Sequence, residues 1–207
     1  MNTRYKKMGA SSSSPSSSSP SRSSGSGYSQ MLYFDPEADS SSDIGYSISD
    51  DKIRDRIAEL TDATEQIWRV SIYRHPLSED QITDIYMYHA FVVFETEKWW
   101  WSIEKNEENV TIQRSKKIEY VRDKYRRQSR PTVNIAHGQW GHELSAKGKG
   151  SVQDLVNFLW RKDHVRKGYN FLFANCKYFA RDVFNETNGD NWQISAGVGL
   201  RVLADLP

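Results

Sequence analysis

The sequence predicts an α+β protein in which an antiparallel β-sheet packs against helices. Between residues 67 and 114, runs rich in β-branched and aromatic residues are joined by short polar links, as in a meander of antiparallel strands. After them, apolar residues recur at helical spacing in 151–161 and in 176–186. With 207 residues and 37% hydrophobic content, the chain has room for one modest domain with a real core.

The N-terminal part of the chain lacks the pattern of a hydrophobic core. Residues 11–27 are nearly all Ser, Pro and Gly, and an acidic, serine-rich stretch follows them. Such a composition does not bury enough apolar surface to offset the entropy of the chain. We therefore expect a disordered arm over residues 1–48 and a single folded domain over residues 49–207.

Strands are expected where β-branched and aromatic residues cluster. The strongest signal lies at 86–95, which reads YMYHAFVVFE. An alternating pattern before it ends at His75-Pro76, because proline cannot donate to a strand ladder. The expected strands are 67–73, 86–95, 98–105 and 109–114.

Helices are expected where apolar residues recur every three or four positions. Ser151 is placed to cap one of them, and Asn188-Gly189 ends another. Residues 131–149 contain several glycines and are expected to be irregular. The expected helices are 51–60, 116–128, 151–161 and 176–186.

Composition also limits the class of protein. The formal net charge is +1, so no global field directs the chain toward nucleic acid or membranes. One cysteine argues against a secreted fold held by disulfides, and no apolar region follows the first residues as in a signal peptide. No run approaches the ~18 apolar residues of a transmembrane segment. We expect a soluble, cytoplasmic protein without cofactor or metal ion, and make no prediction about its oligomeric state.

Cys176 is the only cysteine of the chain and is expected at the first turn of the helix 176–186. Three interpretations are open: an inert buried cysteine, a surface thiol or a nucleophile. Backbone N–H groups and the positive end of the dipole at a helix N-terminus favour thiolate over thiol, which activates the sulfur. The Cys176 N–H, with the side chain of Asn175 as a further candidate donor, is also placed to stabilise an oxyanion.

A thiolate nucleophile needs a proton acceptor within hydrogen-bonding distance. The chain has five histidines. His75 precedes a proline in an expected turn, and three others lie in polar sequence that is loop-like or flanks a helix (His137, His142 and His164). Only His89 lies within an expected strand, where the sheet fixes its position. His89 is therefore the candidate general base, with a structural role as the alternative.

Glu104 is the candidate residue for orienting His89. If the two strands turn tightly and symmetrically about Thr96-Glu97, then Glu95 faces Lys98 and His89 faces Glu104, on the same side of the sheet. Glu104 then accepts the second imidazole N–H. A three-residue loop would place Glu104 on the wrong face. The alternative for Glu104 is a surface ion pair with a nearby lysine.

One basic segment is a candidate surface for an anionic partner. It holds eight Lys and Arg from Arg114 to Arg130, against only Glu119 and Asp123. Anionic lipid, phosphate or an acidic protein would fit such a segment. The alternative is a solvated helix face. The rest of the chain gives no strong signal for nucleic-acid binding.

Two segments together resemble the permuted papain-like thiol fold of the NlpC-like superfamily, in which a strand histidine precedes a cysteine at a helix N-terminus. Residues 88–94 (YHAFVVF) resemble the W-H-T-x-V-V-V strand of the PPPDE thiol peptidases, which remove ubiquitin or its relatives. Residues 169–180 (YNFLFANCKYFA) resemble their Y-x-L-x-x-x-N-C-N-x-F-S segment. They are equally similar to the N-C-E-H-F segment of the lecithin:retinol acyltransferase group, which acts on phospholipid and acyl esters.

This chain departs from both families. The PPPDE glycine after the strand is replaced by Glu95-Thr96-Glu97, and Glu104 lies where the acyltransferase group has a second histidine. The resemblance covers residues 86–105 and 169–186 well and the region between them poorly.

The resemblance implies a cysteine-dependent hydrolase or acyl-transfer enzyme with a Cys176-His89 dyad, acting on a protein or lipid-ester substrate. A peptidase or isopeptidase is slightly favoured, because no C-terminal apolar anchor of the acyltransferase type is seen. A phospholipid or acyl-ester acyltransferase is the first alternative. A catalytically silent binding or scaffold domain, which uses the aromatic strands and the basic segment as contact surfaces, is the second.

Overall fold

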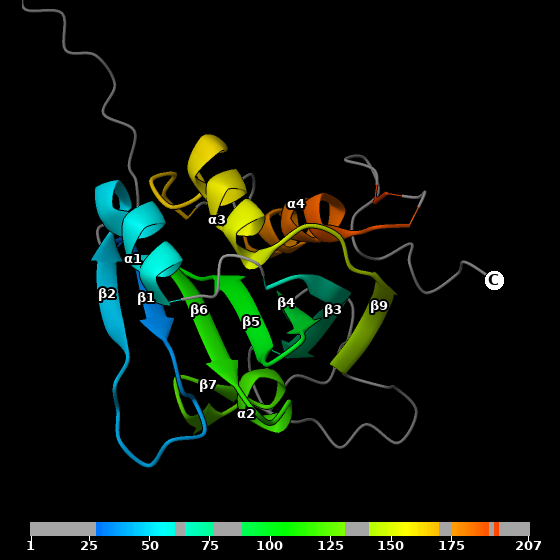
Figure 1. The fold of residues 1–207 in the computed structure, drawn as a ribbon, viewed down its shortest axis with the longest axis horizontal. Coiled ribbons are helices and arrows are strands. Elements are labelled where there is room, and N and C mark those ends of the chain that lie inside the picture. The colour runs from blue at the N-terminus through cyan, green and yellow to red at the C-terminus, as the bar shows by residue number, and fades with distance from the viewer. Residues whose placement is uncertain are drawn as a thin grey trace, which may run out of the picture.

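A computed structural model describes residues 28–60, 65–76, 88–130, 141–169, 175–190 and 193–194. These residues form a mixed α+β structure with one large sheet and a few helices (Figure 1). The strands of the large sheet are β1 (Met31–Asp35), β2 (Tyr46–Ser49), β3 (Ile67–Pro76), β4 (Tyr88–Thr96), β5 (Trp100–Lys105), β6 (Val110–Ser115) and β9 (Gly141–Lys147). Their spatial order is β2-β1-β6-β5-β4-β3-β9. Neighbouring strands are antiparallel except for the parallel pair of β1 and β6.

The helices and a small hairpin complete the structure. The helices are η1 (Asp50–Lys52), α1 (Ile53–Leu60), α2 (Glu119–Arg122), α3 (Val152–Arg161) and α4 (Cys176–Thr187), and the hairpin consists of β7 (Lys124–Tyr125) and β8 (Gln128–Ser129). Figure 1 shows α1, α3 and α4 gathered on one side of the sheet, with α2 and β7 on the other side of the molecule.

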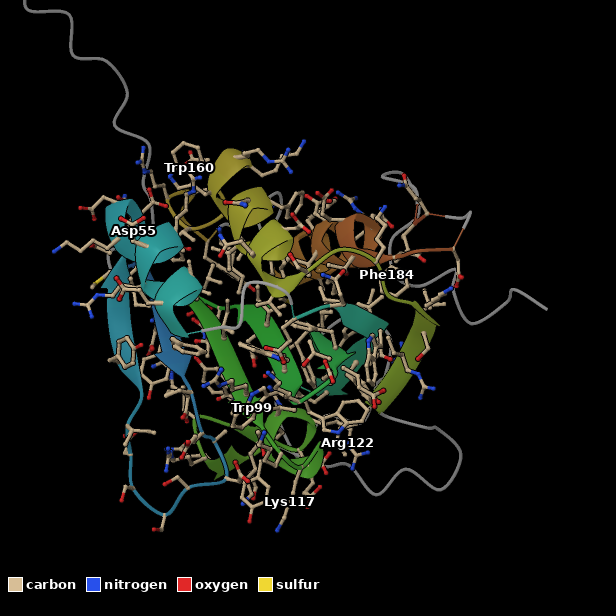
Figure 2. All side chains as sticks on the ribbon, viewed as in Figure 1. Asp55, Trp99, Lys117, Arg122, Trp160 and Phe184 are labelled. Carbon is tan, nitrogen blue, oxygen red and sulfur yellow. The ribbon has the colours of Figure 1, made fainter. Side chains whose placement is uncertain are left out.

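The alternation of β4 separates two hydrophobic clusters, because successive side chains of a strand point to opposite faces. Ala90, Val92 and Phe94 belong to the main core, which includes the buried faces of α3 and α4. Phe91 and Val93 belong to a smaller cluster with α2. In Figure 2, Phe184 lies between α4 and the sheet, whereas Trp160 lies at the outer end of α3. His89 shares the face of Phe91 and Val93, which directs it away from the main core.

The predicted boundary between arm and domain at residue 48 is wrong, because the sheet includes β1 and β2. The run Met31–Asp35 is apolar enough to bury Leu32 and Phe34 fully. It pairs with β6 on one side and β2 on the other. Pairing with a strand distant in the sequence therefore places this short apolar run in the sheet, although the serines and acidic residues around it predict disorder. The part of the predicted arm over residues 1–27 lies outside the described residues.

The predicted helix at 116–128 is also wrong except for one turn in its middle. Only Glu119–Arg122 is helical, and the chain then turns back as the β7–β8 hairpin. Arg126 and Arg127 have φ angles of 43° and 70°, which lie outside any right-handed helix. Within the stretch expected to be irregular, residues 141–147 form β9 and pair with β3. Residues 131–140 lie outside the described part of the chain.

Where the chain is described, no helix combines the length and apolar character needed to span a membrane.

Candidate functional site: a cysteine, histidine and glutamate chain

Cys176 is the first residue of α4, as the sequence predicts, and is buried at 4% exposure. The side-chain oxygen of Asn175 accepts the N–H groups of Lys177 and Tyr178 and so caps the helix. The N–H of Cys176 takes no part in these two capping hydrogen bonds. The helix start therefore keeps one backbone donor beside the sulfur.

The sulfur of Cys176 lies at the edge of β4, near the end where β4 no longer pairs with β5. β3 pairs with β4 from Thr96 to Tyr88, whereas the pairing of β4 with β5 covers only Val92 to Glu95. Beyond Val92, the polar backbone groups on this edge of β4 need other partners. The Ala90 N–H hydrogen-bonds the Cys176 sulfur, and the Tyr88 carbonyl accepts from the thiol at 3.9 Å. The N-terminus of α4 is thus seated against the edge of β4.

His89 lies on this part of β4 and hydrogen-bonds Cys176. Its Nε2 lies 2.8 Å from Oε2 of Glu104. Because Nε2 contacts the carboxylate, Nδ1 is the nitrogen left for the sulfur. The structure therefore brings together the three residues that the sequence selected, in the order Cys176, His89 and Glu104.

The predicted strand register is wrong, although Glu104 still reaches His89. Glu95 pairs with Trp100 and not with Lys98, so Glu104 lies diagonal to His89 and not directly opposite. The cause lies at Thr96, whose N–H and hydroxyl both bond the Trp99 carbonyl and move the turn by one residue. The resulting shift of two residues in pairing preserves the face, so the two side chains remain neighbours.

Arg130 holds the other side of Glu104. Its two terminal nitrogens donate to the two carboxylate oxygens, at 3.0 Å and 2.5 Å. The Arg130 side chain is only 4% exposed and that of Glu104 only 2%. Such bidentate, charge-assisted hydrogen bonds fix the plane of the carboxylate. The sequence gives no local signal for this pair, because the partners are 26 residues apart.

The charges of this cluster stabilise one another. Burial would raise the pKa of Glu104, but the charge of Arg130 and hydrogen bonds from His89 and Arg130 hold that pKa well below its usual range. Burial would lower the pKa of His89, but its hydrogen bonds to Cys176 and Glu104, and their negative charges, raise that pKa to about 9. Burial would raise the pKa of Cys176, but the hydrogen bond and positive charge of His89 outweigh this and lower it. Both shifts favour the thiolate–imidazolium pair over the neutral pair.

Tyr169 is a further residue at the sulfur that sequence reasoning left without a role. Its hydroxyl hydrogen-bonds the Cys176 sulfur and also accepts from the Cys176 backbone N–H. Burial and the negative charge of the thiolate raise the pKa of Tyr169 far above its usual value, so the hydroxyl stays protonated. The available signal was its place at the start of the motif that ends in Asn175-Cys176. Residues 170–174 of that motif lie outside the described part of the chain.

Of the other histidines, His75 and His142 lie on strands, unlike their predicted places, whereas His164 follows α3, as its flanking sequence predicts. His75 lies on β3, not in a turn, and pairs with His89 across the strands. The two rings lie 5.2 Å apart, and Nε2 of His75 lies 3.2 Å from Arg130. His164 packs against Phe158 and Phe179, and burial lowers its pKa to about 4. His137 and the side chain of His142 lie outside the description.

A cavity of about 260 Å³ reaches His89 and Glu104. Its other walls are polar or carry a polar group: His75, Asn106, Tyr125, Gln128, Ser129 and Arg130. A ligand or water entering this cavity would meet both apolar surface and hydrogen-bonding groups.

The basic segment predicted to bind an anion uses part of its charge internally. Arg126, Arg127 and Arg130 donate to carboxylates and carbonyls within the protein. Lys117 and Arg122 lie at the edge of the molecule on the α2 side (Figure 2), where Arg122 pairs with the neighbouring Asp123. Anion binding stays a prediction for such outward residues.

No group of three His, Cys, Asp or Glu side chains is arranged for a metal ion within the described ranges. No model of a protein family matches the chain, and no match was found among curated proteins or solved structures.

Proposed function

We propose that this chain is a cysteine-dependent hydrolase or acyl-transfer enzyme of permuted papain-like type. The observation that carries the proposal is the hydrogen-bonded chain Cys176, His89, Glu104, with the sulfur at a helix N-terminus. The same three components occur wherever a nucleophile is activated by a base that a third group orients. The strand histidine precedes the helix cysteine in the sequence, which is the chain order of the permuted fold.

The proposed reaction begins with the thiolate of Cys176 attacking a carbonyl carbon. A C–S bond forms, and the carbonyl electron pair moves to oxygen. In the free protein the Cys176 N–H bonds the Tyr169 hydroxyl, which also bonds the sulfur. Both groups turn to this oxyanion as its donors, while Asn175 supports them by capping the helix. Protonated His89 then gives its proton to the leaving nitrogen or oxygen, whose bond to carbon breaks. Water or another acceptor, deprotonated by His89, attacks the thioester and releases the acyl group.

Within this class, we propose peptide or isopeptide bonds as the substrate. Both the strand 88–94 and the segment 169–180 resemble the PPPDE peptidases, which favours a peptide or isopeptide bond. An acyl or phospholipid ester is the second candidate and rests on the resemblance of Asn175-Cys176-x-x-Phe179 alone. A ubiquitin-type activity probe beside a panel of lipid esters separates the two, since only one set should label or turn over.

The pH dependence of Cys176 alkylation tests the proposal. We expect iodoacetamide to label the protein with a midpoint below the ~8.5 of a free thiol, because the pKa of Cys176 is lowered. His89→Ala should move the midpoint up to or above ~8.5, since burial then acts without the imidazolium. His164→Ala, which removes an imidazole packed against phenylalanines, is the matched control and should leave the midpoint unchanged.

A wild-type midpoint near ~8.5 that His89→Ala does not move would contradict an activated thiolate. It would favour the silent binding domain.

Tyr169→Phe is expected to slow turnover about 10- to 100-fold while the fold is kept. The variant removes one oxyanion donor, whose loss in other acyl-transfer enzymes costs about 10²–10³ in rate. It also removes a hydrogen bond to the sulfur, so the alkylation midpoint should rise. Steady-state kinetics and alkylation measure the two effects. Tyr178→Phe, on the exposed side of α4, is the control. Unchanged kinetics in Tyr169→Phe would remove Tyr169 from the mechanism.

A further inference from the structure

The turn that delivers Arg130 to Glu104 is held in an unfavourable backbone conformation. Arg126 and Arg127 both have positive φ, where asparagine and glycine are usual. Their own side chains compensate for this. Arg126 donates to Asn109 and Glu108, and its backbone N–H donates to Gln113.

Arg127 anchors the same turn on its other side. It donates to Asp35 and to the carbonyls of Glu37 and Ser40, in the loop after β1. The Arg130 N–H then closes the hairpin onto the Asp123 carbonyl at 2.9 Å. The hairpin is therefore fixed at three points, which sets the position from which Arg130 extends.

The guanidinium of Arg130 is held by more than its ion pair. It lies 3.9 Å from the ring centre of Phe91, and one of its nitrogens lies 3.2 Å from Nε2 of His75. A planar cation stacked on an aromatic ring and bonded in two places has few orientations left. Glu104 is thereby held in the one plane that points its Oε2 at His89.

The cluster has a simple charge order: Arg130 positive, Glu104 negative, His89 positive and Cys176 negative. Two positive and two negative buried charges balance only when the sulfur is a thiolate. A buried charge without a partner is strongly unfavourable. Arg130 therefore lets Glu104 remain ionised and so supports the imidazolium that supports the thiolate.

We propose that Arg130 is a positioning residue for catalysis, which acts through Glu104 and His89 on Cys176. This inference rests on the proposed function and adds a fourth residue to the chain formed by Cys176, His89 and Glu104. Other titratable groups facing the cluster are His75 from β3, Tyr125 from β7 and Tyr169 before α4.

The effect of removing the charge has a definite sign. Without the charge of Arg130, protonation of Glu104 becomes more favourable, so the pKa of Glu104 rises. A less ionised Glu104 supports the imidazolium of His89 less, so the pKa of Cys176 rises as well. A purely structural ion pair would lower the folded fraction but leave the titration of the sulfur unmoved. The pH profile therefore distinguishes the two roles.

The test compares Arg130→Met, Arg130→Lys and Arg161→Met by iodoacetamide labelling of Cys176 against pH. Arg130→Met should shift the acid limb of labelling upward by up to about one pH unit, because the charge acts on the sulfur through Glu104 and His89 and not in direct contact. Arg130→Lys keeps the charge but not the bidentate contact, so its limb should stay near that of wild type while turnover falls at least about tenfold. Arg161→Met, the control, removes an exposed arginine of α3 that pairs with Glu186 and takes no part in the cluster, so it should leave the limb unchanged.

The outcomes separate this inference from the proposed function. If His89→Ala moves the midpoint but folded Arg130→Met does not, the role of Arg130 is refuted and the dyad stands. If neither variant moves it, the dyad fails as well. Should Arg130→Met not fold, Arg130→Lys decides, because turnover within twofold of wild type would refute a positioning role.

Discussion

Replacing Cys176 with alanine is expected to abolish turnover, with a fall of at least about a thousandfold for any acyl substrate that the protein accepts. The sulfur is the only atom of the site that can form the covalent intermediate of the proposed reaction. His89 and the oxyanion donors remain in the variant, so substrate binding should survive. The measurement is the turnover rate beside the dissociation constant of an unreactive substrate analogue.

Thiol labelling reports on this site alone, because Cys176 is the single cysteine of the chain. Labelling stoichiometry therefore reports one site with no background. The variant should also lower the pKa of His89 from about 9, since the hydrogen bond and charge of Cys176 raise it. Histidine NMR titration detects that shift. Turnover that persists in Cys176→Ala would mean that another group carries the chemistry.

The helices at the site could be predicted because their signals are local. Ser151 caps α3 and forms a reciprocal capping box with Asp154, as an N-cap serine before an apolar run suggests. Asn175 caps α4 in the same way, which puts Cys176 in the first turn. Cap residues and apolar spacing lie within four positions of one another, so one segment contains all the information needed.

The register of β4 and β5 could not be predicted, because it depends on the bonding of one side chain in the turn. Thr96 bonds Trp99, and its hydroxyl also contacts buried Glu65, which comes from before β3. That contact is long-range and leaves no local pattern. The parity of the loop was predicted correctly, and parity alone decides that Glu104 shares the face of His89.

Arg130 could not be predicted as part of the site for a related reason. Its neighbourhood is a charged stretch with helical character, and a surface helix is the usual outcome for such a composition. Instead, Arg126 and Arg127 adopt positive φ because their side chains find partners in β6 and in the loop after β1. Tertiary contacts overrule local propensity here, which is common where a site needs a residue in a fixed place.

Glu104→Gln is expected to lower the free energy of unfolding by about 3–5 kcal/mol, because it leaves Arg130 as a buried cation without its partner. The amide has nearly the shape of the carboxylate, so packing changes little. Glu65→Gln is the matched control, since Glu65 is also buried but its carboxylate bonds the neutral Thr96 hydroxyl. It should cost about 1 kcal/mol. Urea unfolding at pH 6 measures both.

The pH dependence of this loss follows from two opposite shifts. The pKa of Glu104 is lower in the folded state than its ordinary value of 4.5, so its stabilising effect is present above that value and is lost at lower pH. The pKa of His89 is raised from 6.5 to about 9, so its stabilising effect is full below 6.5 and is lost as the pH rises through about 9. The difference between wild type and Glu104→Gln should therefore be largest between these ordinary values.

The double variant Glu104→Gln, Arg130→Met decides whether charge or packing causes the loss. If an unpaired buried cation is the cause, removing Arg130 as well should recover most of the stability that Glu104→Gln alone removes, because replacing both partners of a buried ion pair is often neutral. Additive losses in the double variant would show that each residue stabilises the fold independently. If stability recovers but turnover is still lost, the Glu104–Arg130 pair serves to set the pKa values of His89 and Cys176 and not to stabilise the fold.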